Sequence, residues 1–225
     1  MSLIGRAVVA IWNDILPEGR ENFIEWHDRQ HIPERVAIPG FHRGRRLVAE
    51  RGSPEYFTLY EARDEAVLVG PDYLERLNNP TDWTRRSTAD FRNTARGVCR
   101  TVWSHGAGEG GTMLTLRFDA EPRNAALLKA HLTGGALAAI QELPGVTGVH
   151  LCIADPEASG LETAERKGRE VGVPSWIILV EGVSSGAVDT AADRLVEGGL
   201  EQRGAVGLER GVYRLEFSLR EDAEQ

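Results

Sequence analysis

The run 25–35 is the densest cluster of polar side chains in the chain, and it contains two histidines. If residues 18–31 form a helix, His27 and His31 lie four residues apart on one face of it. An imidazole titrates near neutral pH, so it can accept or donate a proton during a reaction. We expect His31 to transfer the proton, with His27 and Asp28 as its supports. Asp28 lies about one turn before His31 and could orient its ring.

Pro33 should end that helix, because the residue before a proline is pushed out of the helical conformation. His31 would then lie in or near the last turn, where the helix dipole raises the pKa of an imidazole modestly. The alternative interpretation is that His27 and His31 are solvated helix residues beside Arg29 and Glu34.

A metal site at the histidine pair needs at least one more ligand. Two histidines at this spacing supply two ligands, whereas a mononuclear site usually has a third from the protein. His42 or Glu34 could complete the set, but no glutamate directly follows His27, so the zinc-protease motif is absent. A single histidine would be enough for haem, but no other feature of the sequence points to haem. We expect neither a metal nor an organic cofactor, and a metal- or haem-dependent oxidoreductase stays open as an alternative.

Arginines in the next predicted strand could hold an anionic substrate. In the strand 41–50, Arg43 and Arg45 share one face with Phe41 and Leu47. We expect Arg45 to line a cavity and to pair with a carboxylate or phenolate of the substrate. The alternative is that these arginines are edge-strand charges that discourage aggregation.

The strand after it carries hydroxyl and aromatic side chains at alternate positions. Tyr56, Thr58 and Tyr60 therefore lie on one face of the strand 55–61. We expect Tyr56 and Tyr60 to contact the substrate.

The elements that would position these residues occur twice along the chain. The sequence of each half predicts a strand, a helix, two strands, a second helix and a closing strand. In both halves the second of these strands follows a Pro-Gly pair. This order is that of the split βαβ, or ferredoxin-like, unit. The predicted strands are 7–12, 41–50, 55–61 and 98–104 in the first half, and 113–118, 146–154, 175–181 and 212–219 in the second.

A glycine-rich stretch at 106–111 separates the copies, giving units at 1–106 and 107–225. Helices cover only one face of such a sheet, so the bare face must find a partner. We predict an α+β protein in which two tandem ferredoxin-like βαββαβ units pack sheet to sheet as a pseudo-dimeric α/β barrel. The charged segment 155–172 interrupts the second unit and is predicted to be a mobile insertion.

The two copies differ at the histidine positions. Aligning the Pro-Gly pairs, which are 105 residues apart, places Leu132 opposite His27 and Ala136 opposite His31. The asymmetry favours one working site, in the first unit, and a mainly structural second unit.

Three features together resemble the dimeric α/β-barrel superfamily, with EthD-like proteins as the nearest group. They are the order of elements, the His27/His31 pair ahead of Pro39-Gly40-Phe41, and Ala89-Asp90-Phe91 late in the second helical segment. Muconolactone isomerases, cofactor-independent monooxygenases, polyketide cyclases and some haem-binding proteins share this fold. The resemblance implies a small aromatic or lactone-like ligand between sheet and helices, often with a histidine that transfers a proton.

Composition narrows the class of protein. The 225-residue chain has a net charge of −8, with 26 basic and 34 acidic residues, so no basic surface predicts a nucleic acid or membrane partner. No apolar run approaches the roughly 20 residues of a membrane span, and the N-terminus does not resemble a signal peptide. Two cysteines exclude a disulfide scaffold. We expect a cytoplasmic protein with a small-molecule ligand, in which a homodimer is the expected assembly.

These observations favour an enzyme of small-molecule metabolism that acts on an aromatic, quinone-like or lactone substrate without an organic cofactor. Isomerisation, cyclisation, decarboxylation and oxygenation are all compatible with a histidine acid or base. The alternative from another class is a ligand-binding or stress-responsive barrel without catalytic activity.

Overall fold

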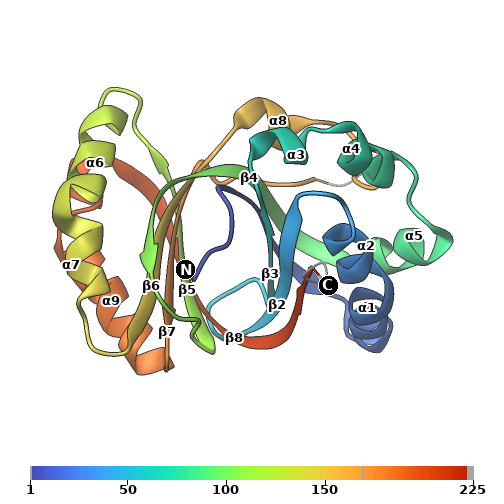
Figure 1. Ribbon diagram of the computed structural model, residues 1–225, viewed down its shortest axis with the longest axis horizontal. Helices are drawn as coiled ribbons and strands as arrows, with labels where there is room; N and C mark the ends of the chain where they lie inside the picture. Colours follow the sequence, from blue (N-terminus) through green and yellow to red (C-terminus); the bar gives the residue numbers. More distant parts are fainter. Residues whose placement is uncertain (1, 169, 222–225) are drawn as a thin grey trace.

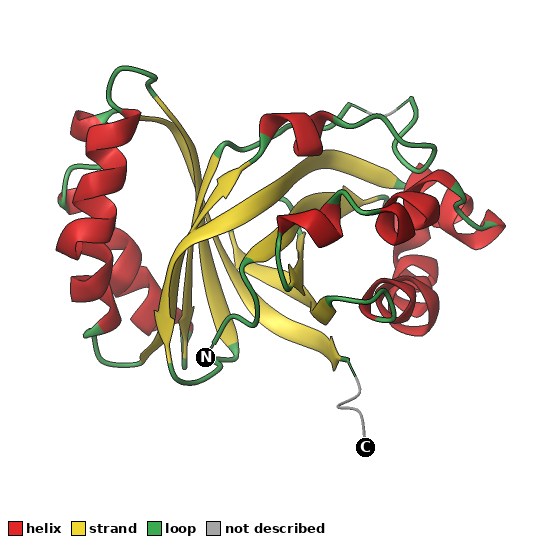
Figure 2. Ribbon diagram, turned by 45° about the horizontal axis from the view of Figure 1, so that its top comes forward, coloured by secondary structure: helices red, strands yellow, loops and turns green. Residues whose placement is uncertain are grey.

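Eight antiparallel strands form a closed barrel in the computed structural model, which describes residues 2–168 and 170–221 (Figure 1). Apart from one short helix of the second half, the helices of the two halves cover opposite sides of the barrel (Figure 2). The first half comprises β1 (Ala7–Ile15), α1 (Arg20–Trp26), α2 (Ile32–Val36), β2 (Phe41–Arg51), β3 (Tyr56–Ala62), α3 (Glu65–Leu68), α4 (Pro71–Asn78), α5 (Asp82–Ala89) and β4 (Phe91–Gly106). The second comprises β5 (Thr112–Ala120), α6 (Ala125–His131), α7 (Leu137–Gln141), β6 (Val146–Ala154), α8 (Pro156–Gly160), β7 (Trp176–Gly182), α9 (Ser185–Glu197) and β8 (Ala205–Arg220).

Each half contributes one four-stranded sheet, in the orders β4-β1-β3-β2 and β8-β5-β7-β6. The sheets join edge to edge where β2 pairs with β8 and β4 pairs with β6. The predicted α+β pseudo-dimeric barrel is therefore confirmed. Because the described strands close on themselves, none of them keeps a free edge.

The two halves repeat each other closely in their first helical segments. α1 and α6, and likewise α2 and α7, begin 105 residues apart. In both halves a five-residue π turn, at His27–His31 and at Leu132–Ala136, joins the two helices at the same spacing. The halves differ in the segment 155–172, which has no counterpart between β2 and β3, and before the closing strand, where the first half has α3, α4 and α5 and the second has α9.

The helical segment of the first half continues past Pro33, which corrects the prediction that it ends near His31. In the π turn the backbone N–H of Ile32 bonds to the carbonyl of His27, five residues earlier. The extra residue in this turn lets Pro33, which has no N–H to donate, lie in the first turn of α2. His31 is consequently inside a longer helical segment that runs to Val36, and the expected effect of a helix C-terminus on its pKa has no structural basis.

A bulge at the start of β2 changes which side chains share a face. Phe41 pairs with Ala62 and Arg43 pairs with Glu61, so the strand gains a residue between them. Phe41 therefore packs on the helix side, with its ring centroid 5.2 Å from that of Tyr73. Arg43 and Arg45 point into the barrel instead, which corrects the prediction that they share the face of Phe41.

Apolar clusters lie inside the barrel and between each sheet and its helices, and the barrel also holds the buried ion pairs of Arg43 and Arg45 with Glu61. The interior cluster includes Trp12, Phe57, Leu59 and Tyr213. A second cluster of apolar side chains lies between the second sheet and helices α6, α7 and α9, whereas the matching layer of the first half also contains the buried polar side chains of His27 and His31. No helix in residues 2–168 or 170–221 has both the length and the apolar character required to cross a membrane.

Candidate functional site

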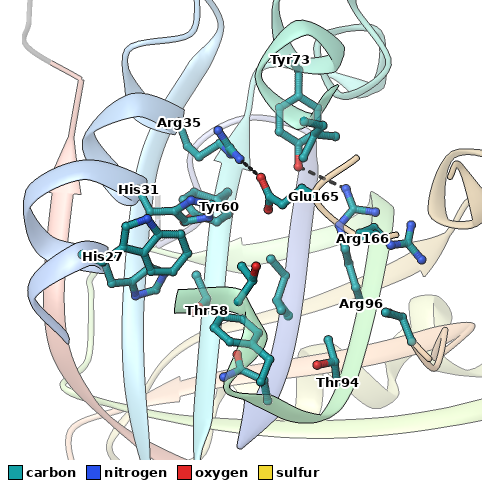
Figure 3. A pocket seen from close by; sticks show the side chains of 17 residues that line it. His27, His31, Arg35, Thr58, Tyr60, Tyr73, Thr94, Arg96, Glu165 and Arg166 are labelled. Carbon is teal, nitrogen blue, oxygen red and sulfur yellow. Dashed lines mark hydrogen bonds and ion pairs between the residues drawn. The ribbon is translucent and has the colours of Figure 1, made fainter. Parts of the chain in front are cut away.

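A cavity of about 40 Å³ lies between the first sheet and the helices of the first half (Figure 3). Its floor is the outer face of β1, β3 and β4, and one wall is the helical segment 26–35. α4 and α5 contribute to the lining, and the insertion of the second half closes it with Glu165, Arg166 and Val171. In this closed form the cavity has room for only a few water molecules.

The two histidines of the π turn face this cavity in an aromatic stack. His27 and His31 are 3% and 6% exposed, and their ring centroids are 5.5 Å apart. Trp26 lies 4.2 Å from His31, centroid to centroid, and Phe23 lies 4.8 Å from His27. Burial lowers the pKa of His27 well below its usual value, and the nearby charges of Arg46 and Arg35 add to the effect. His27 is therefore a neutral imidazole at pH 7, the form that can accept a proton.

Three buried polar atoms on the cavity lining have no hydrogen-bond partner among the described residues. They are Nδ1 of His27, the hydroxyl of Tyr60 and Nδ2 of Asn13. Burial raises the pKa of Tyr60 well above its usual value, so its hydroxyl stays protonated. Because a buried polar atom without a partner costs free energy, this arrangement is typical of a site that receives hydrogen bonds from a ligand or water.

A buried ion pair links the site helix to the insertion of the second half. Nη2 of Arg35 lies 2.5 Å from Oε2 of Glu165. The backbone N–H of Glu165 also bonds to the carbonyl of Leu77 at the end of α4, 3.0 Å away. The described part of the segment 155–172 is therefore docked onto the first half, which corrects the prediction of a mobile insertion.

Arg96 of β4 is a second guanidinium on the lining, 7% exposed. Its Nη2 donates a hydrogen bond to the hydroxyl of Tyr73 at 3.1 Å, as Figure 3 shows. The sequence reasoning missed Arg96, Tyr73 and Glu165. Alternation along β4 would have placed Arg96 and Val98 on one face, but no pattern indicated that this face also carries the site.

The structure brings His27, His31 and Tyr60 together, whereas the other three predicted site residues do not line the cavity. Oδ1 of Asp28 binds Nη1 of Arg46 at 2.5 Å. Arg45 lies inside the barrel, where Nη2 is 3.0 Å from Glu61 and 3.1 Å from Glu181. The ring of Tyr56 packs against Phe23, with a centroid distance of 4.8 Å.

The residues around the histidines do not suit a metal ion. His42, one proposed third ligand, is hydrogen-bonded to Glu221, and Glu34 accepts a hydrogen bond from Gln30. The described residues contain no group of three or more histidine, cysteine, aspartate or glutamate side chains placed to hold one. The charges of Arg35 and Arg46 that disfavour protonation of His27 also disfavour a cation there.

Haem does not fit this cavity either. In the closed form the space of about 40 Å³ is far smaller than a porphyrin, and Trp26 and Phe23 already stack against the two imidazoles.

Comparison with known proteins finds structures with the same fold. No protein-family model matches the chain, and no curated protein matches it in sequence. A crystal structure of an anthrone oxidase-like protein matches over 97% of this chain and 94% of its own, with a TM-score of 0.66 and 13% identity. A candidate monooxygenase from Fusobacterium nucleatum subsp. nucleatum matches over 99% and 98%, with a TM-score of 0.60 and 8% identity.

A haem-binding protein from Thermus thermophilus also matches, over 95% of this chain and 92% of its own, with a TM-score of 0.54 and 11% identity. Together these similarities confirm the resemblance to the dimeric α/β-barrel superfamily at the level of the fold.

Proposed function

We propose that the cavity of the first half binds a small aromatic molecule and that His31 takes a proton from it. The observation that carries this proposal is the pair of buried imidazoles, His27 and His31, that face an aromatic cavity. At the equivalent positions of the second half, Leu132 and Ala136 pack against apolar neighbours. Structural similarity to an anthrone oxidase-like protein and to a candidate monooxygenase supports a reaction on a polycyclic phenol.

In the proposed step, His31 accepts the proton of a phenolic O–H or of a C–H next to a carbonyl. The bond to hydrogen breaks, its electron pair stays on the substrate, and an N–H forms on the imidazole. Tyr60, held protonated by burial, donates a hydrogen bond to the developing oxyanion. With an anthrone and dioxygen the overall change is balanced: a ring CH₂ becomes C=O, and one O₂ yields that oxygen and one water.

His27 is the second imidazole of the proposed site. Its lowered pKa keeps it neutral, so it does not repel a protonated His31 beside it. We propose that it positions His31 through ring stacking and hydrogen-bonds the substrate through Nδ1. We assign no role to Asp28 in orienting His31, because Arg46 binds its carboxylate.

A substrate of this size must enlarge the cavity. Arg166 and Val171 line both the cavity and an outer hollow formed mainly by residues 160–168. We propose that this described part of the insertion moves outward and joins the two spaces, while Gly172 stays bonded to Thr94 and Arg96 of β4.

We also propose that residues 1–106 and 107–225 arose as two copies of one unit and that the first carries the reacting groups. The second unit contributes the wall at Glu165, so it has a role in the site besides a structural one. A homodimer stays a proposal, and it would use helices because the barrel edges are paired.

Oxygen uptake with 1,8-dihydroxyanthrone, corrected for spontaneous oxidation, tests the proposal. Wild-type protein that has been treated with a chelator should still accelerate oxygen uptake. The rate with His31→Ala should be at least about 100-fold lower. His131→Ala removes an imidazole from the equivalent helix of the other half and should keep it. Equal rates for the wild type and His31→Ala would overturn the role of His31.

The second candidate is a binding protein without turnover, which the closed and narrow cavity favours. It predicts that a stable aromatic ligand raises the melting temperature while no product forms. Isothermal titration with an anthraquinone, alongside product analysis, distinguishes binding alone from turnover.

A further inference from the structure

Arg96 is the feature of the cavity that the proposed proton transfer leaves unexplained. Its side chain is 7% exposed, yet no carboxylate among the described residues lies within ion-pair distance of its guanidinium. Among the described residues, its one side-chain hydrogen bond goes to the hydroxyl of Tyr73. Arg35, on the same lining, has Glu165 as its counter-ion. A buried charge without a counter-ion is costly, so Arg96 is typical of a group that awaits an anion.

The surroundings of Arg96 define which anion would fit. A guanidinium has five N–H donors, of which Tyr73 takes one, and the remaining donors match the two oxygens of a carboxylate. Tyr73 accepts the bond from Arg96, so its own hydroxyl proton can be donated to the same ligand. Figure 3 shows Arg96 on the floor of the cavity, across from the helix that carries His27 and His31.

We infer that the cavity selects aromatic molecules that carry a carboxylate, which Arg96 and Tyr73 bind while the ring faces His27 and His31. The inference rests on the proposed function in one respect, that the ligand occupies this cavity. It adds the class of substrate: an aromatic acid, anchored at one end by a charge and presented to the imidazoles at the other.

The test compares two ligands that differ only in charge. 1-Hydroxy-2-naphthoate and 1-hydroxy-2-naphthamide have the same ring system, and only the first is an anion at pH 7. Isothermal titration should give the wild type at least about tenfold tighter binding of the acid. In Arg96→Gln the preference should vanish through loss of acid affinity, and Arg96→Lys should keep part of it. Arg100→Gln, which changes an exposed arginine of the same strand that pairs with Glu65, should behave like the wild type.

Equal affinity of the wild type for the acid and the amide would overturn the inference, and so would a failure to bind either. A preference that persists in Arg96→Gln would place the carboxylate elsewhere and would also overturn it. If Arg96→Gln does not fold, the inference is judged on the wild type alone. Its preference for the acid over the amide should then be present and should weaken when the salt concentration is raised. The role of His31 is judged separately by oxygen uptake, so either proposal can fail without the other.

Discussion

The carboxylate of Glu165 lies 2.5 Å from the guanidinium of Arg35, although the two residues belong to different halves of the chain. This ion pair fixes an insertion of the second half over the cavity of the first (Figure 3). The side chains are 12% and 3% exposed, so water screens the pair little. Both halves therefore form the site, and access to it depends on the Arg35–Glu165 ion pair, which a single substitution can remove.

Glu165→Gln should destabilise the protein and open the cavity. The change leaves Arg35 buried without a counter-ion, which costs about 3 kcal/mol in comparable pairs. Urea unfolding should show this loss, and hydrogen exchange should increase in residues 160–168. Glu162→Gln changes an exposed carboxylate of the same segment and should leave both measurements unchanged. A loss below about 0.5 kcal/mol would mean that the pair does not hold the segment.

Lowering the pH should reduce the free energy of unfolding, because two histidines are buried in the neutral form. Burial lowers the pKa of His27 well below 6.5, and burial with the charges of Arg45 and Arg43 lowers that of His150 to about 3. In the unfolded chain both protonate near pH 6.5. The unfolded state then binds more protons, so stability is fully present above about pH 6.5 and is lost as the pH falls toward the folded-state values.

His27→Leu should reduce this loss. Each buried neutral histidine contributes up to about 1.4 kcal/mol per pH unit below its unfolded pKa. Between pH 6.5 and 5.0 the free energy of unfolding of His27→Leu should fall less than that of the wild type. His105→Leu, which removes an exposed imidazole outside the cavity, is the matched control. Parallel curves for the wild type and His27→Leu would show that His27 is not held neutral.

Arg45→Met should destabilise the barrel without acting on the cavity. Arg45 is 2% exposed and bridges Glu61 and Glu181, which are fully buried. Removing it leaves Glu181 without an arginine partner, whereas Glu61 keeps Arg43, and the expected cost is about 3–5 kcal/mol. Binding of 1-hydroxy-2-naphthoate, measured below the lowered melting temperature, should be unchanged. A selective loss of binding at unchanged stability would restore the substrate role that the sequence predicts for Arg45.

The sequence predicts the fold and part of the site for definite physical reasons. Repeated strands and Pro-Gly turns reveal the βαββαβ order, and helical spacing brings His27 and His31 to one face. Alternation along β3 puts Thr58 and Tyr60 on the floor of the cavity. Phe41 does not share the face of Arg43 and Arg45 because the bulge between Phe41 and Arg43 reverses the inward and outward faces there, which strict alternation cannot anticipate.

Long-range contacts account for the rest of the site. Glu165 reaches Arg35 across 130 residues, and nothing local in its sequence indicates a docked position. Arg96 reaches Tyr73 from a strand whose outer face is defined only once the barrel closes. The continuation of the helix past Pro33 depends on the π turn, which has no simple residue signature.

Tyr60→Phe should separate stability from binding. The hydroxyl of Tyr60 is buried on the cavity lining without a hydrogen-bond partner among the described residues, so removing it should leave the free protein equally stable or more stable, by up to about 1 kcal/mol. The same change should weaken binding of 1-hydroxy-2-naphthoate and slow oxygen uptake, because the substrate oxyanion loses a donor. Tyr56→Phe alters a neighbouring tyrosine that lies off the cavity, and it should leave binding and turnover unchanged. A loss of more than about 1 kcal/mol in Tyr60→Phe would show that this hydroxyl supports the fold, and unchanged binding would remove Tyr60 from the site.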